Sequence, residues 1–289
     1  MHRGKDRSLK AVLSIVSAAT FVFASIGCSS PQAATSGTTA PASTRSAETA
    51  PPVELTVQAA ASLTDVLNEV ISAYEAAHPG VTFTVNYDSS GNLQAQIEQG
   101  APADLFISAA KKNMDALEDA GYLDEDTRKD VLGNSLVVIV PKGGAARVSS
   151  FTDLASGKIA VVAIGDPQSV PAGKYGWQAL TAAGVAETIK PKTVMGKDVR
   201  AVLTYVETGD ADAGIVYKTD ALTSPKVRIA FGIDSSMHDP IVYPAAVIKS
   251  SAHAQDARSF VEYLCGPEAL SVFEKFGFSR PPTVLSSGR

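Results

Sequence analysis

The feature that most constrains this chain is a strand followed at once by a helix, with only small or hydroxyl-bearing residues between them. Residues 54–58 are predicted to form a short strand, and apolar residues from Leu63 onward recur at the spacing of one helix face. Ser62 stands between the two and is expected to cap the helix, with Asp65 three residues later. Such a helix start suits an anion, because it presents free N–H groups and the positive end of the helix dipole. Taken alone, the stretch is better explained as an ordinary capped helix.

The same kind of junction recurs three more times. Residues 88–91 open a second helix, residues 165–173 lead from a buried strand into a third, and Asp198 begins a fourth. A strand then ends in Tyr217. Strands that alternate with helices predict an α/β chain with mostly parallel sheets, whose ligands lie beyond the carboxyl ends of the strands. Two of these junctions come early and two come late, which predicts two lobes with a ligand between them.

The first 27 residues are typical of a secretory signal. Four basic residues precede an apolar run over residues 11–26, which is short for a membrane span. Gly27 and Cys28 follow, and Cys28 resembles the lipidated cysteine of a bacterial lipoprotein, although Ser25 stands where that pattern usually has leucine. We therefore expect residues 1–27 to be removed and Cys28 to carry a lipid anchor. A plain secreted protein is the alternative.

The segment 28–52 is rich in Ser, Thr, Ala and Pro and is expected to be a disordered tether, so that the body spans residues 53–289. From Cys28 onward 21 basic residues face 29 acidic ones, a net charge of −8. This balance argues against nucleic acid or an anionic lipid surface as partner of the body. Cys265 is the only cysteine of the body and is expected to be buried, without a disulfide.

The sequence offers no recognisable catalytic motif. Gly133-Asn134-Ser135 lacks the second glycine of a nucleophile elbow, and Lys174 follows a glycine without the spacing of a phosphate-binding loop. His78, His238 and His253 are isolated, which argues against a zinc site. We therefore expect no enzyme activity, no resident metal and no cofactor.

What remains is a set of neutral hydrogen-bond donors, in which hydroxyl groups come from one set of residues and backbone N–H groups from another. A charge-assisted hydrogen bond contributes roughly 1.5–3 kcal/mol, so several that converge could hold a small dianion without a Lys or Arg. Because such a site has only donors, it would favour a fully deprotonated anion. The hydroxyl donors are Ser62, Ser90 and Tyr217, and the backbone donors are the helix starts at Ala172 and Val199.

Several segments, in the same order along residues 54–278, resemble the molybdate-binding protein of the molybdate ABC transporter. Motifs of this length in one order are far more specific together than any of them alone. The segments are Ala59-Ala60-Ala61-Ser62-Leu63-Thr64, Gly100-Ala101-Pro102-Ala103-Asp104-Leu105-Phe106-Ile107-Ser108, Leu132-Gly133-Asn134-Ser135-Leu136-Val137-Val138, Gly165-Asp166-Pro167, Val170-Pro171-Ala172-Gly173, Asp198-Val199-Arg200, Gly214-Ile215-Val216-Tyr217 and Phe276-Gly277-Phe278.

The resemblance implies a two-lobed periplasmic-binding-protein fold of type II, which closes over molybdate or tungstate. Lobe 1 would comprise residues of about 53–136 and 240–289, and lobe 2 residues of about 137–239. The family's oxyanion ligands match Ser62, Ser90, Ala172, Val199 and Tyr217, with Ser89 as an alternative to Ser90. Molybdenum would be held only as the oxyanion, and Arg200 is expected to bridge the lobes rather than bind the anion.

These observations predict a monomeric receptor, lipid-anchored on the extracytoplasmic face of the cell membrane. It would deliver molybdate to the permease of an ABC importer and its ATPase. A receptor for sulfate or another tetrahedral oxyanion is the first alternative, because sulfate is also a tetrahedral dianion. An anchored hydrolase is the second alternative and would differ by turning over ester substrates.

Overall fold

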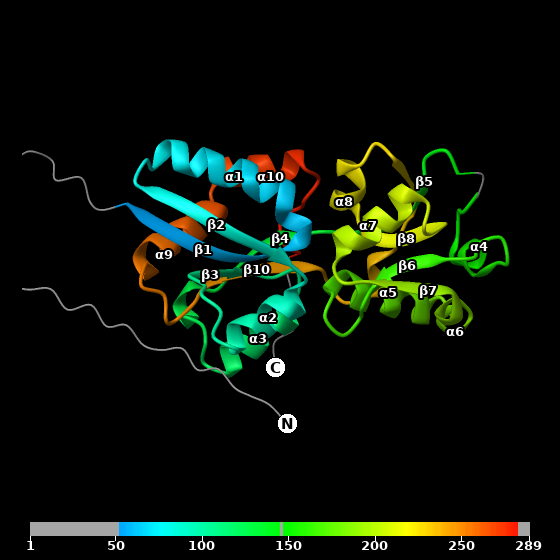
Figure 1. Cartoon of the computed structure of the whole chain (residues 1–289), viewed down its shortest axis with the longest axis horizontal. Coiled ribbons are helices and arrows are strands. Elements are labelled where there is room, and N and C mark those ends of the chain that lie inside the picture. The colour runs from blue at the N-terminus through cyan, green and yellow to red at the C-terminus, as the bar shows by residue number, and fades with distance from the viewer. Residues whose placement is uncertain (1–51, 145–146, 283–289) are drawn as a thin grey trace, which may run out of the picture. The chain divides into compact units, whose positions relative to one another are not determined.

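The structure is a computed structural model that describes residues 52–144 and 147–282. The predicted signal peptide, Cys28 and the tether, apart from its last residue, lie outside the described residues. The described body contains two five-stranded sheets, each covered by helices (Figure 1).

The first sheet has the strand order β2-β1-β3-β10-β4. Helices α1, α9 and α10 cover one of its faces, and α2 and α3 pack with a smaller apolar cluster on the other face. We call this sheet with its helices lobe 1. Its elements are β1 (Val53–Ala60), α1 (Thr64–Ala77), β2 (Val81–Asp88), α2 (Ser90–Glu98), β3 (Leu105–Ile107), α3 (Lys111–Asp119), β4 (Lys129–Gly133), β10 (Val242–Val247), α9 (Ala254–Leu264) and α10 (Pro267–Lys275), with the short 3₁₀ helices η1 (Ala61–Leu63) and η2 (Glu125–Thr127).

The second sheet has the order β7-β6-β8-β5-β9, and we call it with its helices lobe 2. Helices α5 and α7 both pack on its central strands. Its elements are β5 (Leu136–Pro141), α4 (Phe151–Ala155), β6 (Val162–Gly165), α5 (Pro171–Ala182), α6 (Ala186–Ile189), η3 (Lys190–Lys192), β7 (Thr193–Gly196), α7 (Val199–Thr208), β8 (Ala213–Tyr217), α8 (Lys218–Thr223), β9 (Val227–Gly232) and η4 (Ser235–Met237).

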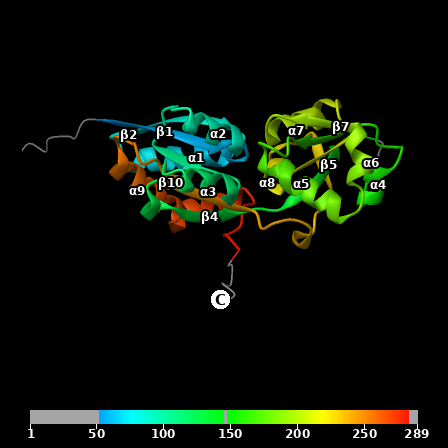
Figure 2. The same cartoon turned by 90° about the horizontal axis from the view of Figure 1, so that it is seen from below.

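The chain crosses between the lobes twice, through residues 134–135 before β5 and through residues 233–241 before β10 (Figure 2). The strands reached by these crossings, β5 and β10, run antiparallel to both of their neighbours, whereas the other pairs in each sheet are parallel. Each sheet is therefore mixed, and the expectation of mostly parallel sheets was too strong.

The sequence predicts that Pro244 lies at a sheet edge or at a crossing between the lobes, and that Cys265 is buried. Pro244 lies in β10, an interior strand that follows the second crossing directly, and the pairing with β4 shifts its register beside it. A proline can occupy such a place because the irregular pairing does not require its missing N–H group. Cys265 is exposed at the end of α9 rather than buried, because it follows the last inward-facing residue of that helix, Leu264.

Candidate functional site

All five residues singled out from the sequence line one small cavity between the lobes. Ser62 and Ser90 come from lobe 1, and Ala172, Val199 and Tyr217 come from lobe 2. The cavity volume open to the centre of a water-sized sphere is about 10 Å³. A cavity of this size has room for about one water molecule, so it suits only a very small solute.

Two helix N-termini of lobe 2 end at the cavity wall. Ala172 is the second residue of α5 and Val199 is the first residue of α7, and both are buried. N–H groups in the first turn of a helix have no intrahelical acceptor, and they add the positive end of the helix dipole. Asp198 caps α7 by accepting a 2.8 Å hydrogen bond from the N–H group of Ala201, which leaves the N–H of Val199 outside this cap. These helix starts are therefore suited to an anion.

Ser62 does not cap α1, contrary to the sequence prediction. The chain first forms the 3₁₀ turn η1, so that α1 begins later, at Thr64, with Leu63 in the cap position and no side-chain cap. The Oγ atom of Ser62 instead lies 2.9 Å from the Oη atom of Tyr243, and both side chains are buried. The Ser62 side chain therefore does not cap α1, and it lines the cavity instead.

Ser89 and Ser90 both line the cavity but have different bonds. Ser89 is the N-cap of α2, and its Oγ accepts a 3.3 Å hydrogen bond from the N–H group of Asn92. Ser90 is fully buried, and its Oγ accepts a 2.9 Å bond from the N–H group of Ala109. In both residues the hydroxyl proton remains available to a third group. Either hydroxyl could therefore donate to an anion, and Ser90 stays the candidate, with Ser89 as the alternative, as the family resemblance implies.

Tyr217 ends β8 and has only 1% of its surface exposed. Its Oη atom has no hydrogen-bond partner among the described residues, although it lines the cavity. Burial raises the pKa of the Tyr217 hydroxyl well above its ordinary value, so the group stays protonated at physiological pH. A buried donor without a partner costs about 1–3 kcal/mol, and an acceptor in the cavity would remove that cost.

Within the described residues no Lys or Arg lines this cavity, and its one ionisable carboxylate is Asp88. Asp88 Oδ1 accepts hydrogen bonds from the N–H group of Ser89 at 2.7 Å and from Asn92 Nδ2 at 3.1 Å. The carboxylate is thus engaged with protein donors. Asp88 and Ala109 were not predicted to line the cavity, because a carboxylate repels an anion and an alanine side chain donates no hydrogen bond.

Two of the contacts between the lobes are made by direct chain neighbours of lining residues, Arg200 beside Val199 and Gly91 beside Ser90. Arg200 of α7 lies 2.6 Å from Asp65 of α1 through its Nη2 atom, and 2.6 Å from the fully buried Asp220 through its Nε atom. The expectation that Arg200 bridges the lobes is confirmed. Burial raises the pKa of Asp220 to about 7, although the positive charge of Arg200 opposes this rise.

The second contact joins the backbones of the two lobes directly. The N–H group of Gly91 in α2 donates a 2.9 Å hydrogen bond to the carbonyl of Ser169 in the loop before α5. A Cβ atom at Gly91 would lie 2.6 Å from that carbonyl oxygen, so only glycine allows this approach. With both contacts made, the cleft is closed over the cavity.

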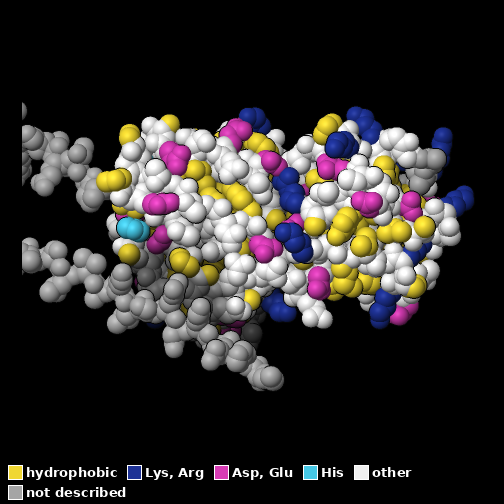
Figure 3. Space-filling model, viewed as in Figure 1, with side chains coloured by type: hydrophobic (Ala, Val, Ile, Leu, Met, Phe, Trp, Pro, Cys, Tyr) yellow, Lys and Arg dark blue, Asp and Glu magenta, His cyan; other side chains and the backbone are white. Residues whose placement is uncertain are grey.

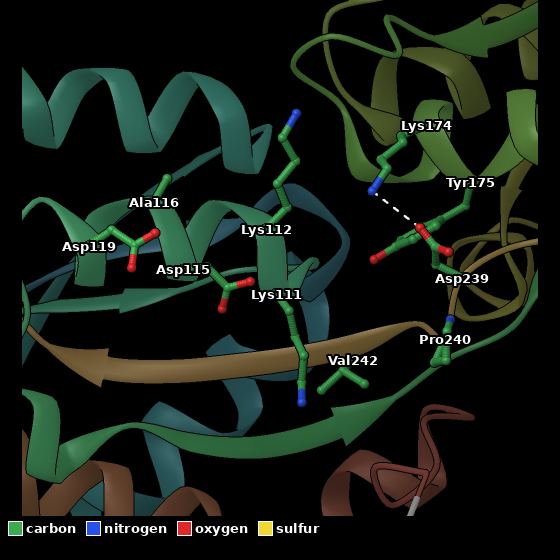
Figure 4. A pocket seen from close by; sticks show the side chains of 10 residues that line it. All are labelled: Lys111, Lys112, Asp115, Ala116, Asp119, Lys174, Tyr175, Asp239, Pro240 and Val242. Atoms are coloured by element: carbon green, nitrogen blue, oxygen red, sulfur yellow. Dashed lines mark ion pairs between the residues drawn. The ribbon is translucent and has the colours of Figure 1, made fainter. Parts of the chain in front are cut away.

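A wider hollow lies elsewhere on the junction of the lobes. Lys111 and Lys112 of α3 and Lys174 of α5 line this groove, together with Asp115 and Asp239 (Figure 4). On the face seen in Figure 3, Lys and Arg side chains lie near acidic ones along the same junction. Lys111 pairs with Asp130 at 2.7 Å and Lys174 pairs with Asp239 at 3.3 Å. The groove has charged pairs and is open to solvent, whereas the small cavity has neutral donors and is closed.

In residues 52–144 and 147–282, no group of three or more His, Cys, Asp or Glu side chains could hold a metal ion. No helix of the same part is long and apolar enough to cross a membrane.

The chain is similar to known solute-binding proteins over nearly all of its body. A family model described as bacterial extracellular solute-binding protein matches residues 55–279. YvgL of Bacillus subtilis, a lipoprotein assigned to substrate binding for an ABC transporter, is 46% identical over 88% of this chain and 92% of its own. The molybdate-binding protein ModA of Escherichia coli is 39% identical over 78% of this chain and 89% of its own.

A solved structure gives the same result for the fold. The periplasmic molybdate-binding protein of Azotobacter vinelandii superposes with a TM-score of 0.72 at 25% identity, over 79% of this chain and all of its own. The expected two-lobed periplasmic-binding-protein fold of type II is thereby confirmed. So is the expectation that the chain is not an enzyme, because this family binds solutes. The chain belongs to the bacterial extracellular solute-binding proteins, among relatives of the ModA type.

Proposed function

We propose that this protein is the receptor of an ABC importer that captures molybdate outside the cytoplasmic membrane. The similarity to ModA and to YvgL supports this assignment. The observation that carries it is the Tyr217 hydroxyl, which is buried and protonated and has no hydrogen-bond partner in the described part of the chain, at a small cavity that also contains two helix starts. A tetrahedral dianion would supply the missing acceptor.

The proposed ligand contacts are the hydroxyls of Ser62, Ser90 and Tyr217 and the N–H groups of Ser62, Ala172 and Val199. Each charge-assisted hydrogen bond contributes roughly 1.5–3 kcal/mol after the exchange with water, and donors that are held in place beforehand lose little of this to ordering on binding. Burial of all five residues supplies that preorganisation. Tungstate has the same charge and shape and is proposed as a second ligand.

The proposal extends to the arrangement of the chain. Residues 1–27 would be a signal peptide of lipoprotein type, Cys28 the lipid anchor and residues 28–52 the tether that holds the body at the cell membrane. The lipoprotein relative supports this. Lobe 1 would comprise residues of about 53–136 and 240–289 and lobe 2 residues of about 137–239, and the two crossings near residues 134–135 and 233–241 support these limits. The closed monomer would dock on the permease and its ATPase.

Calorimetry on the mature chain from Cys28 onward tests this function. We expect saturable binding of one molybdate or tungstate per chain, with sulfate and phosphate much weaker. Sulfate binding as tight as molybdate binding would overturn the choice of ligand and favour a sulfate receptor. If no oxyanion bound and none raised the melting temperature, the receptor function itself would be wrong. Trp177, in α5 behind Ala172, offers a fluorescence readout of the same binding.

A further inference from the structure

The hydroxyl of Tyr243 contacts the proposed site without lining its cavity. Tyr243 lies in β10, and its side chain is fully buried. Its Oη atom is 2.9 Å from Ser62 Oγ and 3.1 Å from Asn134 Nδ2. A tyrosine hydroxyl has one proton to donate and lone pairs that accept. Which neighbour receives that proton decides how Ser62 presents its own hydroxyl to the cavity.

The orientation of the Asn134 side-chain amide shows which neighbour receives the Tyr243 proton. Its Oδ1 atom accepts a 2.8 Å hydrogen bond from the N–H group of Ser135, so its Nδ2 atom is the end that faces the interior. Nδ2 donates one proton to Thr219 Oγ1 at 2.9 Å and the other to Tyr243 Oη at 3.1 Å. An amide nitrogen is only a donor, so the Tyr243 oxygen must accept here.

Tyr243 then has one proton left, and Ser62 Oγ lies 2.9 Å from its oxygen. The ring of Tyr217 lies 5.8 Å from that of Tyr243, but its hydroxyl forms no hydrogen bond with any described residue. In the opposite arrangement Ser62 would donate to Tyr243, and the fully buried proton of Tyr243 would have only this unbonded Tyr217 oxygen to turn to. A buried donor without a partner carries its whole desolvation cost. The favoured direction therefore runs from Asn134 through Tyr243 to Ser62, whose own proton turns toward the cavity.

We propose that Asn134 and Tyr243 are positioning residues which, by donating in sequence toward Ser62, hold the Ser62 hydroxyl as a donor to the bound oxyanion. This inference rests on the proposed function. Asn134 lies in the crossing between β4 and β5, and Thr219 lies in α8 of lobe 2. The chain of hydrogen bonds thus ties one crossing between the lobes to the anion donor of lobe 1. The N–H group of Ala109 donates to Ser90 Oγ in the same way, so that the proton of Ser90 is also left for the cavity.

A double-mutant cycle on the mature chain tests the proposal, with molybdate as the probe and calorimetry as the readout. Tyr243→Phe should weaken binding about tenfold, because Ser62 loses the donor that fixes its direction. In a Ser62→Ala background the same change should have less than about a twofold effect, since no hydroxyl is left to orient. Asn134→Leu should weaken binding in the wild-type background and add nothing to Tyr243→Phe.

Tyr122→Phe is the matched control, because it removes a tyrosine hydroxyl of lobe 1 that bonds to Glu98 O away from the cavity. It should leave molybdate affinity unchanged. Melting temperatures without ligand identify any variant that does not fold. If Tyr243→Phe does not fold, the cycle between Asn134→Leu and Ser62→Ala tests the proposal in its place. Additive losses in the double variants, with wild-type binding intact, would overturn the inference alone. A wild-type chain that binds no oxyanion would overturn the proposed function, and this inference with it.

Discussion

The two hollows at the lobe junction differ in how they could meet an anion. The open groove of Figure 4 has three lysines, but two of them are already paired with carboxylates and all of them face solvent. The closed cavity has no cation among its described lining, yet it has buried hydroxyls and two helix starts. Exposed charges are screened by water and salt, whereas fixed dipoles in a closed site are not. The smaller and uncharged hollow is therefore the better anion site.

The largest effect should come from removing a donor of the cavity. Ser62→Ala deletes one charge-assisted hydrogen bond of roughly 1.5–3 kcal/mol, which corresponds to about a 10- to 150-fold loss of molybdate affinity. Calorimetry measures this loss. Ser72→Ala is the control, because Ser72 is an exposed hydroxyl of α1 that bonds only to Asn68 O. Equal affinities of the two variants would exclude Ser62 from the site.

A somewhat smaller effect is expected from blocking closure of the cleft. Gly91→Ala places a Cβ atom 2.6 Å from the carbonyl oxygen of Ser169, and overpacking of this kind costs about 1–3 kcal/mol. Molybdate affinity should fall about 5- to 150-fold while the melting temperature of the free protein is nearly unchanged, because only the closed state is destabilised. Small-angle scattering would show a more open form at saturating ligand.

Gly80→Ala is the control for this change, since a Cβ atom at Gly80 meets nothing within 4 Å. Wild-type affinity for Gly91→Ala would mean that the ligand binds without the Gly91–Ser169 contact. The cavity of the closed form would then be the wrong place to look for the site.

The ion pair between the lobes should matter less. Asp65 is about half exposed (45% of its side chain), so Asp65→Asn should cost at most about 1 kcal/mol, a loss of affinity of up to about fivefold. The loss should shrink as salt is added, because salt already screens the pair. Titrations at two salt concentrations check this. A loss that grew with salt, or one as large as that of Ser62→Ala, would mean that Asp65 does more than latch the lobes.

The smallest effect is expected in the groove. Lys112→Ala removes a lysine from its wall, but that side chain is exposed, so molybdate affinity should change by less than about twofold. Competition calorimetry resolves such a difference. A loss comparable to that of Ser62→Ala at physiological salt would reverse the comparison and place the anion in the groove.

The sequence alone was sufficient for much of the site, because its donors belong to local patterns. Ala172 and Val199 stand at predicted helix starts and Tyr217 at a predicted strand end, and the structure has these elements where they were expected. The meeting of these residues with Ser62 and Ser90 could not be derived from spacing, because it depends on how the two lobes close. It was implied only by the family resemblance.

Three other features of the structure could not be predicted from the sequence, each for a physical reason. Tyr243 lies 181 positions from Ser62, so no local pattern connects the two hydroxyls. The 3₁₀ turn η1 delays the start of α1, but in the sequence its serine looks the same as a serine that caps a helix. The direction of β5 and β10 depends on the two crossings, which alternating strands and helices do not reveal.

The most direct test of the proposed anion site is to locate the bound anion itself. Crystals of the mature chain grown with molybdate or tungstate would reveal the metal by its anomalous scattering. We expect one strong peak per chain in the cavity of a closed cleft, with the oxygens of the oxyanion within hydrogen-bonding distance of Ser62 and Tyr217. A peak in the groove beside Lys112 and Lys174, with the cavity empty, would contradict it.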